Sequence, residues 1–415
     1  MKILHLNYTD KIGGAAIAAN RIHNALLESG IDSNMLVKKS IIDDEKIIRP
    51  KYFWEKFINY FKFRFSQVLV KLFFHSDNKT LHSLNLFSCN SLVNFINKSD
   101  YDVIHLHWIG LEMLSIEDLS RINKPIVWTL HDMWAFCGAE HYSDDSRWKK
   151  GYFNSNRPRE EFGFDINKWV WERKRLYWKG RFNIICPSDW LSKCAKESKL
   201  MEDWSVTTIP YPISNKILNP LDKNLAKKTL GLDVNVRYLL FGAMGGTKDP
   251  RKGFDFIEKF LPKLKEENIK IIIFGQKNKI KKTLRESEKI INFGIINDFN
   301  ILGALYSSSE LMIIPSRMDN LPNTALESLI CARPIVAFRT CGLSDIVDHQ
   351  INGYLSQPFD VDDLYNGIRW ILNLDSNSYN KVCLNAKNKA LTKYSPNEVS
   401  KQYLDLYQKV CKEKN

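Results

Sequence analysis

Residues 311–327 read LMIIPSRMDNLPNTALE, and this stretch decides the fold class. The four apolar residues Leu311–Ile314 are too few for a helix and predict a buried strand. A polar loop follows, and residues 323–332 predict a helix. Strands that pass through a loop into a helix build parallel sheets with helices on both faces.

The same alternation runs through the whole chain. It predicts strands and helices on both sides of this stretch: Lys2–Asn7, Ala15–Gly30, Met35–Val37, Val103–His107, Ile126–Leu130, Ile184–Pro187, Tyr238–Phe241, Phe254–Glu267, Lys270–Phe274, Ile290–Phe293 and Ile335–Ala337. Three prolines fall between residues 209 and 222 and indicate a linker. We therefore predict an α/β protein of two doubly wound domains, with a cleft between them. The domains are residues 1–208 and 209–396.

Composition excludes several classes of protein. The 415 residues are 44% hydrophobic and 26% charged, which is typical of a globular protein. Eight cysteines without a Cys-x-x-Cys pair argue against zinc ribbons, disulfide scaffolds and thioredoxin-like chemistry. The start of the chain has no secretory signal, and no run of about 20 apolar residues occurs. A cytoplasmic protein is expected.

The net charge of +13 is concentrated in two windows. Residues 51–75 contribute +4 and residues 146–181 contribute +7, which suggests an anionic partner or simply a solvated basic surface. Within residues 51–74, apolar side chains from Trp54 to Leu72 recur at helical spacing between three lysines and one arginine. Such a helix lies in a membrane interface or packs on its own domain.

Several turns after strands carry polar groups. Gly13-Gly14 lets a phosphate or sugar oxygen approach the backbone. His131 follows a strand, where open α/β sheets bind ligands. Arg251 and Lys252 offer cations to a diphosphate. The chain lacks Gly-x-Gly-x-x-Gly and a Walker lysine, and its spacing suggests no Ser/His/Asp triad.

The loop at residues 315–327 is the most specific of these sites. Asp319 and Glu327 are eight residues apart, with the start of a helix between them. Carboxylates suit polyols because both oxygens accept hydrogen bonds. Glu327 is a candidate for two ribose hydroxyls, and Asp319 for hydroxyls of a sugar.

These residues carry a resemblance. Asp319-x7-Glu327, the following SLICARPIVA, Gly342–Val347 (GLSDIV) and Asn352-Gly353 resemble the donor site of the retaining glycosyltransferases of family 4. The DNLPN loop and the WTLHDMWAF run are similar to the branch that builds bacterial surface polysaccharides, such as colanic-acid-type enzymes. The resemblance covers residues 1–30 and 100–410.

The resemblance implies a glycosyltransferase-B fold with two Rossmann-like domains, the second holding a nucleotide-sugar, and a helix at 397–412 that returns to the first. It implies retaining transfer to a saccharide acceptor, lipid-linked, in capsule, O-antigen or exopolysaccharide synthesis, with no metal and no cofactor. The enzyme would be peripheral at the inner membrane through residues 51–74. The implied catalytic residues are His131, Asp319 and Lys252; the implied donor-binding residues are Gly14, Arg251, Lys252, Asn320, Leu321, Asn323 and Glu327.

The chain departs from the family pattern at two points. Asp319 stands where the family has Glu, and Gly245-Gly246 stand where it has an arginine, which leaves Arg251 as the candidate replacement. Three alternatives stay open: a sugar-nucleotide epimerase, a non-catalytic nucleotide-sugar or polysaccharide-binding protein, and a nucleic-acid binder. The last has basic windows but no recognition motif, and no nucleic-acid partner is expected.

Overall fold

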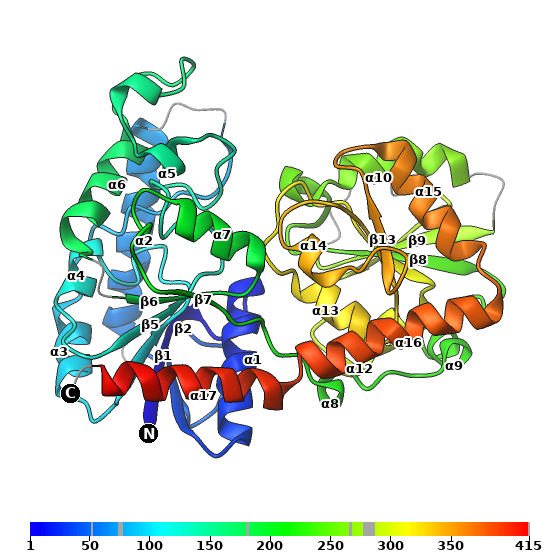
Figure 1. Ribbon diagram of the computed structural model, residues 1–415, viewed down its shortest axis with the longest axis horizontal. Helices are drawn as coiled ribbons and strands as arrows, with labels where there is room; N and C mark the ends of the chain where they lie inside the picture. The colour runs from blue at the N-terminus through cyan, green and yellow to red at the C-terminus, as the bar shows by residue number, and fades with distance from the viewer. Residues whose placement is uncertain (51–52, 74–77, 180–181, 265–267, 277–286, 414–415) are drawn as a thin grey trace. The chain divides into compact units, whose positions relative to one another are not determined.

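The computed structural model describes all residues except 51–52, 74–77, 180–181, 265–267, 277–286 and 414–415. It divides into two compact units (Figure 1). The first comprises Met1–Pro210 and Val399–Asn415, and the second Tyr211–Glu398. The first unit ends at Pro210, two residues beyond the boundary expected from the sequence.

The first unit is built on a seven-stranded sheet whose described pairings are all parallel. Its strand order is β3-β2-β1-β4-β5-β6-β7. The strands are β1 (Lys2–Thr9), β2 (Asp32–Lys39), β3 (Ile47–Ile48), β4 (Val103–Leu106), β5 (Ile126–Thr129), β6 (Phe182–Cys186) and β7 (Val206–Thr208). The register of β1 on β4 places His5 opposite His105.

Helices connect most of these strands, as is usual for parallel pairing, but β2 and β3 are joined without one. They are α1 (Gly14–Glu28), α2 (Phe53–Phe73), α3 (Asn90–Lys98), α4 (Ile116–Ser120), α5 (Arg147–Lys150), α6 (Ile166–Tyr177) and α7 (Asp189–Glu197). The last helix, α17 (Pro396–Lys412), drawn in red in Figure 1, also lies against this unit. Its Ser400 hydroxyl accepts a hydrogen bond from Ser29 at 2.7 Å.

The second unit holds a six-stranded parallel sheet among its described residues, in the order β10-β9-β8-β11-β12-β13. The strands are β8 (Arg237–Gly242), β9 (Ile269–Phe274), β10 (Ile290–Gly294), β11 (Leu311–Ile314), β12 (Ile335–Phe338) and β13 (Gly353–Ser356). Its helices are α8 (Asn215–Leu218), α9 (Lys223–Thr229), α10 (Phe254–Phe260), α12 (Phe299–Ser308), α13 (Asn323–Ile330), α14 (Leu343–Ile346), α15 (Val361–Leu372) and α16 (Ser376–Lys393).

The central strands of both sheets are buried along their whole length. Every residue of β4, β5, β11 and β12 is buried, which is why each of these strands is an apolar run with at most one polar residue. One expected element is shorter than predicted. The helix expected at 254–267 ends at Phe260 and continues as a 3-10 turn, Leu261–Leu264, because Pro262 has no N–H to extend the α-helical hydrogen bonds.

Candidate functional site

The loop after β11 is fixed on both sides. Its Ser316 carbonyl accepts a hydrogen bond from Thr340 at 3.1 Å, and the Asp319 carbonyl accepts one from the Gly342 N–H at 3.1 Å. Asp319 is 7% exposed, so its carboxylate lies in the floor of the loop. The loop is therefore a rigid support for polar side chains at the end of the strand.

The cationic residues lie on a 3-10 turn, Pro250–Lys252, directly against this loop. The Arg251 carbonyl accepts the Arg317 N–H at 2.7 Å. Gly253 follows in the left-handed region, at φ 68°, and a Cβ there would come within 1.8 Å of the Pro315 carbonyl oxygen. Only glycine permits this approach of turn and loop.

This approach brings Lys252 and Asp319 together. The Lys252 ammonium donates to an Asp319 carboxylate oxygen at 2.5 Å, and the Ser316 hydroxyl donates to the same oxygen at 3.3 Å. Two residues that are 67 positions apart in the sequence therefore form one charged site.

Two arginines beside this pair are held by carboxylates. The Arg251 guanidinium donates to Asp249 at 2.7 Å. Arg317 makes a two-pronged contact with both oxygens of Asp255, at 2.7 and 2.6 Å. The contact with Arg317 lowers the pKa of Asp255. Arg251 must leave Asp249 if it is to reach a diphosphate.

Glu327 is the fifth residue of α13 and is 5% exposed. Its carboxylate accepts the Tyr306 hydroxyl from α12 at 2.7 Å. Sequence reasoning missed Tyr306, since a tyrosine inside an apolar helix gives no signal of its partner. Three further expected donor-binding residues, Asn320, Leu321 and Asn323, are also buried around this loop.

The two remaining expected residues belong to the first unit. Gly14 is the exposed first residue of α1, after Gly13 at φ 103°. No atom lies within 4 Å of where a Cβ on Gly13 would stand. His131 follows β5 and is buried, and burial lowers its pKa to about 4, so its imidazole is neutral at pH 7.

Asp132, the residue next to His131, belongs to a hydrogen-bonded Ser/His/Asp group that the sequence spacing does not suggest. The His141 ring joins the Ser83 hydroxyl at 2.8 Å and Asp132 at 2.6 Å. Burial acts to raise the pKa of Asp132, but His141 and the N–H donors of Trp134 and Trp108 together outweigh it, so the pKa is lowered.

This Ser/His/Asp group is not arranged as the catalytic triad of a hydrolase. Ser83 is completely buried, and a Cβ on Gly110 would lie only 2.9 Å from its hydroxyl oxygen. The adjoining cavity, lined by His131 and Asp132 among others, has a volume of ≈ 10 Å³, space for about one water molecule. A substrate carbonyl cannot reach Ser83. The hydrogen bonds of Ser83, His141 and Asp132 instead stabilise the turn after β5.

Three histidines are the one group among the described residues that could place metal-ligand atoms close together. Nitrogen atoms of His5, His105 and His107 lie within 4.8 Å of one another. Both nitrogens of His105 are already engaged, with Thr129 at 2.8 Å and Tyr407 at 2.6 Å. His5 and His107 bond directly to each other at 2.8 Å. All ring nitrogens of these three histidines except His5 Nε2 are engaged in hydrogen bonds to protein groups, which does not favour a metal centre.

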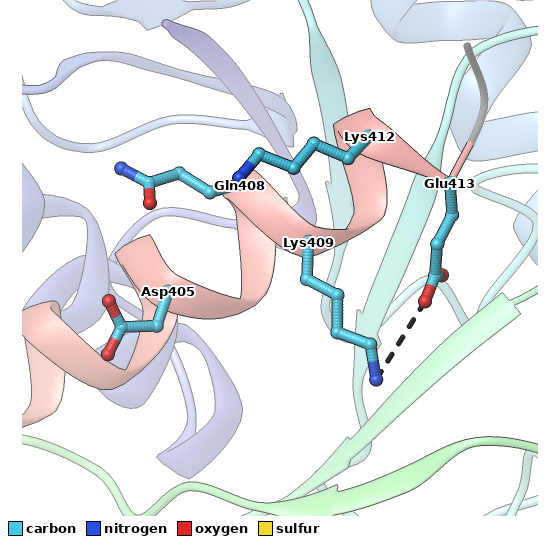
Figure 2. A pocket seen from close by; sticks show the side chains of 5 residues that line it. All are labelled: Asp405, Gln408, Lys409, Lys412 and Glu413. Carbon is cyan, nitrogen blue, oxygen red and sulfur yellow. Dashed lines mark ion pairs between the residues drawn. The ribbon is translucent and has the colours of Figure 1, made fainter.

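A second hollow differs from these groups because it is open and lies on the surface of one helix. Figure 2 shows an open depression at the end of α17, lined by Asp405, Gln408, Lys409, Lys412 and Glu413. An ion pair joins Lys409 and Glu413 at 3.8 Å (Figure 2). Its lining comes from successive turns of one helix and its end, and offers no enclosed polar group to a ligand.

Comparison with known proteins identifies the second unit. Residues 237–374 match the family model of glycosyl transferases group 1. This segment is therefore similar to group 1 glycosyl transferases. It contains every candidate of the second unit, from the cationic turn to Glu327. The chain is also 26% identical over 188 residues to an uncharacterized glycosyltransferase of Methanocaldococcus jannaschii, covering 44% of this chain and 47% of that protein. It thus spans about half the length of that relative.

Solved structures extend the likeness to both units. Sucrose-phosphate synthase from Thermosynechococcus elongatus is 15% identical, with a TM-score of 0.71 and 99% of each chain covered. Anabaena HepE, in complex with UDP and glucose, is 15% identical, with a TM-score of 0.64 over 99% of this chain and 100% of its own. The predicted fold, two Rossmann-like domains of glycosyltransferase-B type, is confirmed.

Proposed function

We propose that this protein transfers a sugar from a nucleotide-sugar to a saccharide acceptor, with retention of anomeric configuration. The observation that carries the proposal is the Lys252–Asp319 pair, which joins a cationic turn to the polyol-binding loop inside the glycosyltransferase domain. Each partner suits one part of the donor: an ammonium suits a diphosphate, and a carboxylate suits sugar hydroxyls.

Within this proposal, each candidate has a role. Glu327 accepts the two ribose hydroxyls, Asp319 holds the transferred sugar, and Lys252 holds the diphosphate, assisted by Arg251. Asn320, Leu321 and Asn323 shape the loop around the donor. For the first unit, we assign Gly14 to the donor phosphates and His131 to the sugar or the acceptor, as the family resemblance implies.

The charge of the leaving group is the main electrostatic demand of such a transfer. As the glycosidic bond to the nucleoside diphosphate breaks, negative charge develops on the diphosphate, and a cation placed there lowers the barrier. Lys252 lies only half-buried on its turn and is free to exchange Asp319 for a phosphate oxygen by a side-chain rotation. We propose that the chain's own cations do this work without a metal.

A panel of nucleotide-sugars tested by thermal shift examines the donor assignment. A true donor raises Tm because it binds the folded state. At 100 times its Kd, it raises the free energy of unfolding by about 2.7 kcal/mol. We expect one donor to raise Tm in EDTA. If no member of the panel does so at millimolar concentration, the donor site is refuted. Stabilisation without transfer to any acceptor would instead favour a non-catalytic binding protein, and turnover without an acceptor an epimerase.

We further propose that the acceptor is lipid-linked, that the pathway is surface-polysaccharide synthesis, and that α2 rests on the inner membrane face. The described helices include none that is long and apolar enough to cross a bilayer. Membrane contact would therefore be peripheral and would need an apolar surface, and α2 provides one.

The polarity of α2 is reversed relative to a core helix. Its uncharged polar side chains face the protein: Asn59 accepts from Lys38 at 2.8 Å, Gln67 donates to the His82 carbonyl at 3.3 Å, and Ser66 is buried. Its apolar side chains are exposed, among them Phe57, Ile58, Tyr60, Phe61, Phe65, Val68 and Leu72, at 43–61%. A continuous apolar face of this kind marks an interaction surface.

Basic residues accompany this face, which favours an anionic bilayer over an apolar protein partner. Arg64 and Lys71 are exposed on the same helix. Each basic residue near an anionic leaflet contributes about 1 kcal/mol, and inserted rings add to it. Part of the helix does pack on its own domain, since the Phe65 and Phe73 ring centroids lie 5.9 and 6.0 Å from those of Phe87 and Phe164, and the proposal rests on the side chains that stay exposed.

Co-sedimentation with vesicles of phosphatidylglycerol and phosphatidylethanolamine tests this proposal. We expect binding that weakens with salt and is lost when Phe57 and Phe61 are both replaced by serine. Leu384→Ser with Leu391→Ser, on exposed positions of α16, is the matched control and should bind like the wild type. No binding of the wild type at low salt refutes the proposal, and a dimer in light scattering would then assign the face to a second copy.

A further inference from the structure

Three aromatic rings are exposed in the connection between α5 and α6, at residues 153–164, which we call the aromatic loop. Phe153, Phe162 and Phe164 are 48%, 65% and 51% exposed. The loop holds one 3-10 turn, Asn154–Asn156. Single exposed apolar residues are normal on a protein surface, whereas a group of large ones marks an interaction site.

Polar groups behind these rings hold the loop in shape. Arg157 donates to the carbonyls of Phe162 and Gly163 at 3.1 and 2.8 Å. The Arg147 side chain, which is 1% exposed, donates to Asp165 at 2.5 Å just after the loop. Charged groups inside with aromatic rings outside are the reverse of ordinary packing. The fold of the loop therefore keeps its rings at the surface.

The aromatic loop continues the exposed apolar face of α2. The Phe164 ring contacts the ring of Phe73, the last residue of α2, in an edge-to-face arrangement. Phe73 is itself 45% exposed, and Leu72 beside it is 61% exposed. The two exposed apolar surfaces therefore meet at the end of the helix.

Basic side chains outnumber acidic ones around the loop. Between residues 147 and 179, the exposed charged residues are Lys149, Lys150, Arg159, Arg175 and Lys179 against Glu160 and Glu172. Aromatic rings with cations beside them suit an anionic bilayer, because the rings enter the headgroup region while the cations meet the negative charge of the leaflet. An apolar protein partner would not complement these cations.

We propose that the aromatic loop is a second membrane contact, which places Phe162 and Phe164 in the headgroup region of an anionic bilayer beside α2. One helix lying on a bilayer can roll about its own axis. A second contact on the same unit prevents this rotation and adds its affinity to that of the helix. The inference rests on the proposed function for the choice of partner, but the contact of the loop is tested separately from that of α2.

Hydrogen–deuterium exchange of the full chain reports on the loop itself. The chain is measured alone and with vesicles of phosphatidylglycerol and phosphatidylethanolamine at low salt. We expect slower exchange in peptides that cover residues 153–164 when these vesicles are present, and no change with neutral phosphatidylcholine vesicles. Unchanged exchange in the loop of a protein that is bound to the anionic vesicles overturns the inference and leaves the α2 contact standing.

Variants of the loop give the second measurement, by titration with the same anionic vesicles. Phe162→Ser with Phe164→Ser should weaken binding by a factor on the order of 10, because two rings no longer leave water. Arg159→Gln should weaken it about fivefold on anionic vesicles and leave binding to neutral ones unchanged. Phe162→Ser alone keeps the contact between Phe164 and Phe73, and replaces the double variant if that variant has a lower Tm.

Leu384→Ser with Leu391→Ser is again the matched control and should bind like the wild type. A loop variant that binds like the wild type overturns the inference. If the loop variant binds weakly but Phe57→Ser with Phe61→Ser does not, the proposed role of α2 fails and that of the loop stands. No binding of the wild type at low salt refutes both. A dimer that the loop variant disperses, with no protection by vesicles, would assign the loop to a second copy.

Discussion

Replacing Glu327 by glutamine tests the donor site with the least change of shape. Glutamine keeps one carbonyl oxygen, which can still accept the Tyr306 hydroxyl, now at 2.7 Å. The fold should therefore survive. The substitution removes the charge and one of two acceptors for ribose hydroxyls.

The size of the effect follows from these bonds. A hydrogen bond to a charged group contributes about 1.5–3 kcal/mol. Losing one of them corresponds to a roughly 10- to 150-fold weaker Kd for the nucleotide-sugar, and for the nucleoside diphosphate alone, because both carry the ribose. Tyr306→Phe is the matched control. It leaves the carboxylate in place and removes one neutral donor, so a loss of only about 2- to 10-fold is expected.

Calorimetric titration of both ligands against the wild type and the variants is the assay. Asp319→Asn adds a contrast, since it acts on the sugar and releases Lys252 from its ion pair. It should reduce transfer strongly while the nucleoside diphosphate binds at least as well as before. An unchanged Kd in Glu327→Gln, with normal transfer, would refute the assignment of Glu327 to the ribose.

Three further predictions concern the turn, the metal and pH. Gly253→Ala should weaken diphosphate binding and lower Tm, because its Cβ would meet the Pro315 carbonyl oxygen at 1.8 Å; Gly231→Ala, at a similar φ of 66° with open space around it, should lower Tm less, and equal losses would contradict the close-approach argument. Transfer should persist in EDTA, and a complete loss that manganese or magnesium restores would reject the metal-free mechanism. Burial lowers the pKa of His23, His82 and His131 to about 4 each, so their stabilisation is complete above pH 6.5 and is lost as pH falls toward 4. At pH 5 each of these histidines should lower the free energy of unfolding by about 2 kcal/mol. Urea unfolding can be followed by tryptophan fluorescence, which reports mainly on the first unit because Trp370 is the one tryptophan outside it. Equal unfolding midpoints at pH 7 and pH 5 would contradict this prediction.

The sequence predicts the fold well where local pattern and tertiary structure agree. Buried parallel strands are short apolar runs, so β11 is recovered with its observed ends, Leu311–Ile314. The short edge strands β3 and β7 were not predicted, because each has only two or three residues and little burial. The helix after Phe254 was predicted too long, since its apolar periodicity continues past Pro262 while its hydrogen bonding does not.

The candidate site divides in the same way. The polar loop and the cationic turn are contiguous motifs, so sequence reasoning finds Asp319, Glu327 and Lys252 separately. It cannot find that Lys252 pairs with Asp319, or that Tyr306 bonds to Glu327, because these contacts depend on which strands are neighbours. The bond between His5 and His107 cannot be predicted for the same reason: nothing in the sequence places β1 beside β4.

One measurement tests the central claim most directly. The protein is incubated in EDTA with the nucleotide-sugar that raises its Tm and with a lipid-linked saccharide acceptor, and the products are followed by NMR. We predict one nucleoside diphosphate released for each glycoside formed, with the anomeric configuration of the donor kept in the product. A donor that binds but yields no glycoside with any acceptor would contradict the account, and a product of inverted configuration would contradict the retaining mechanism.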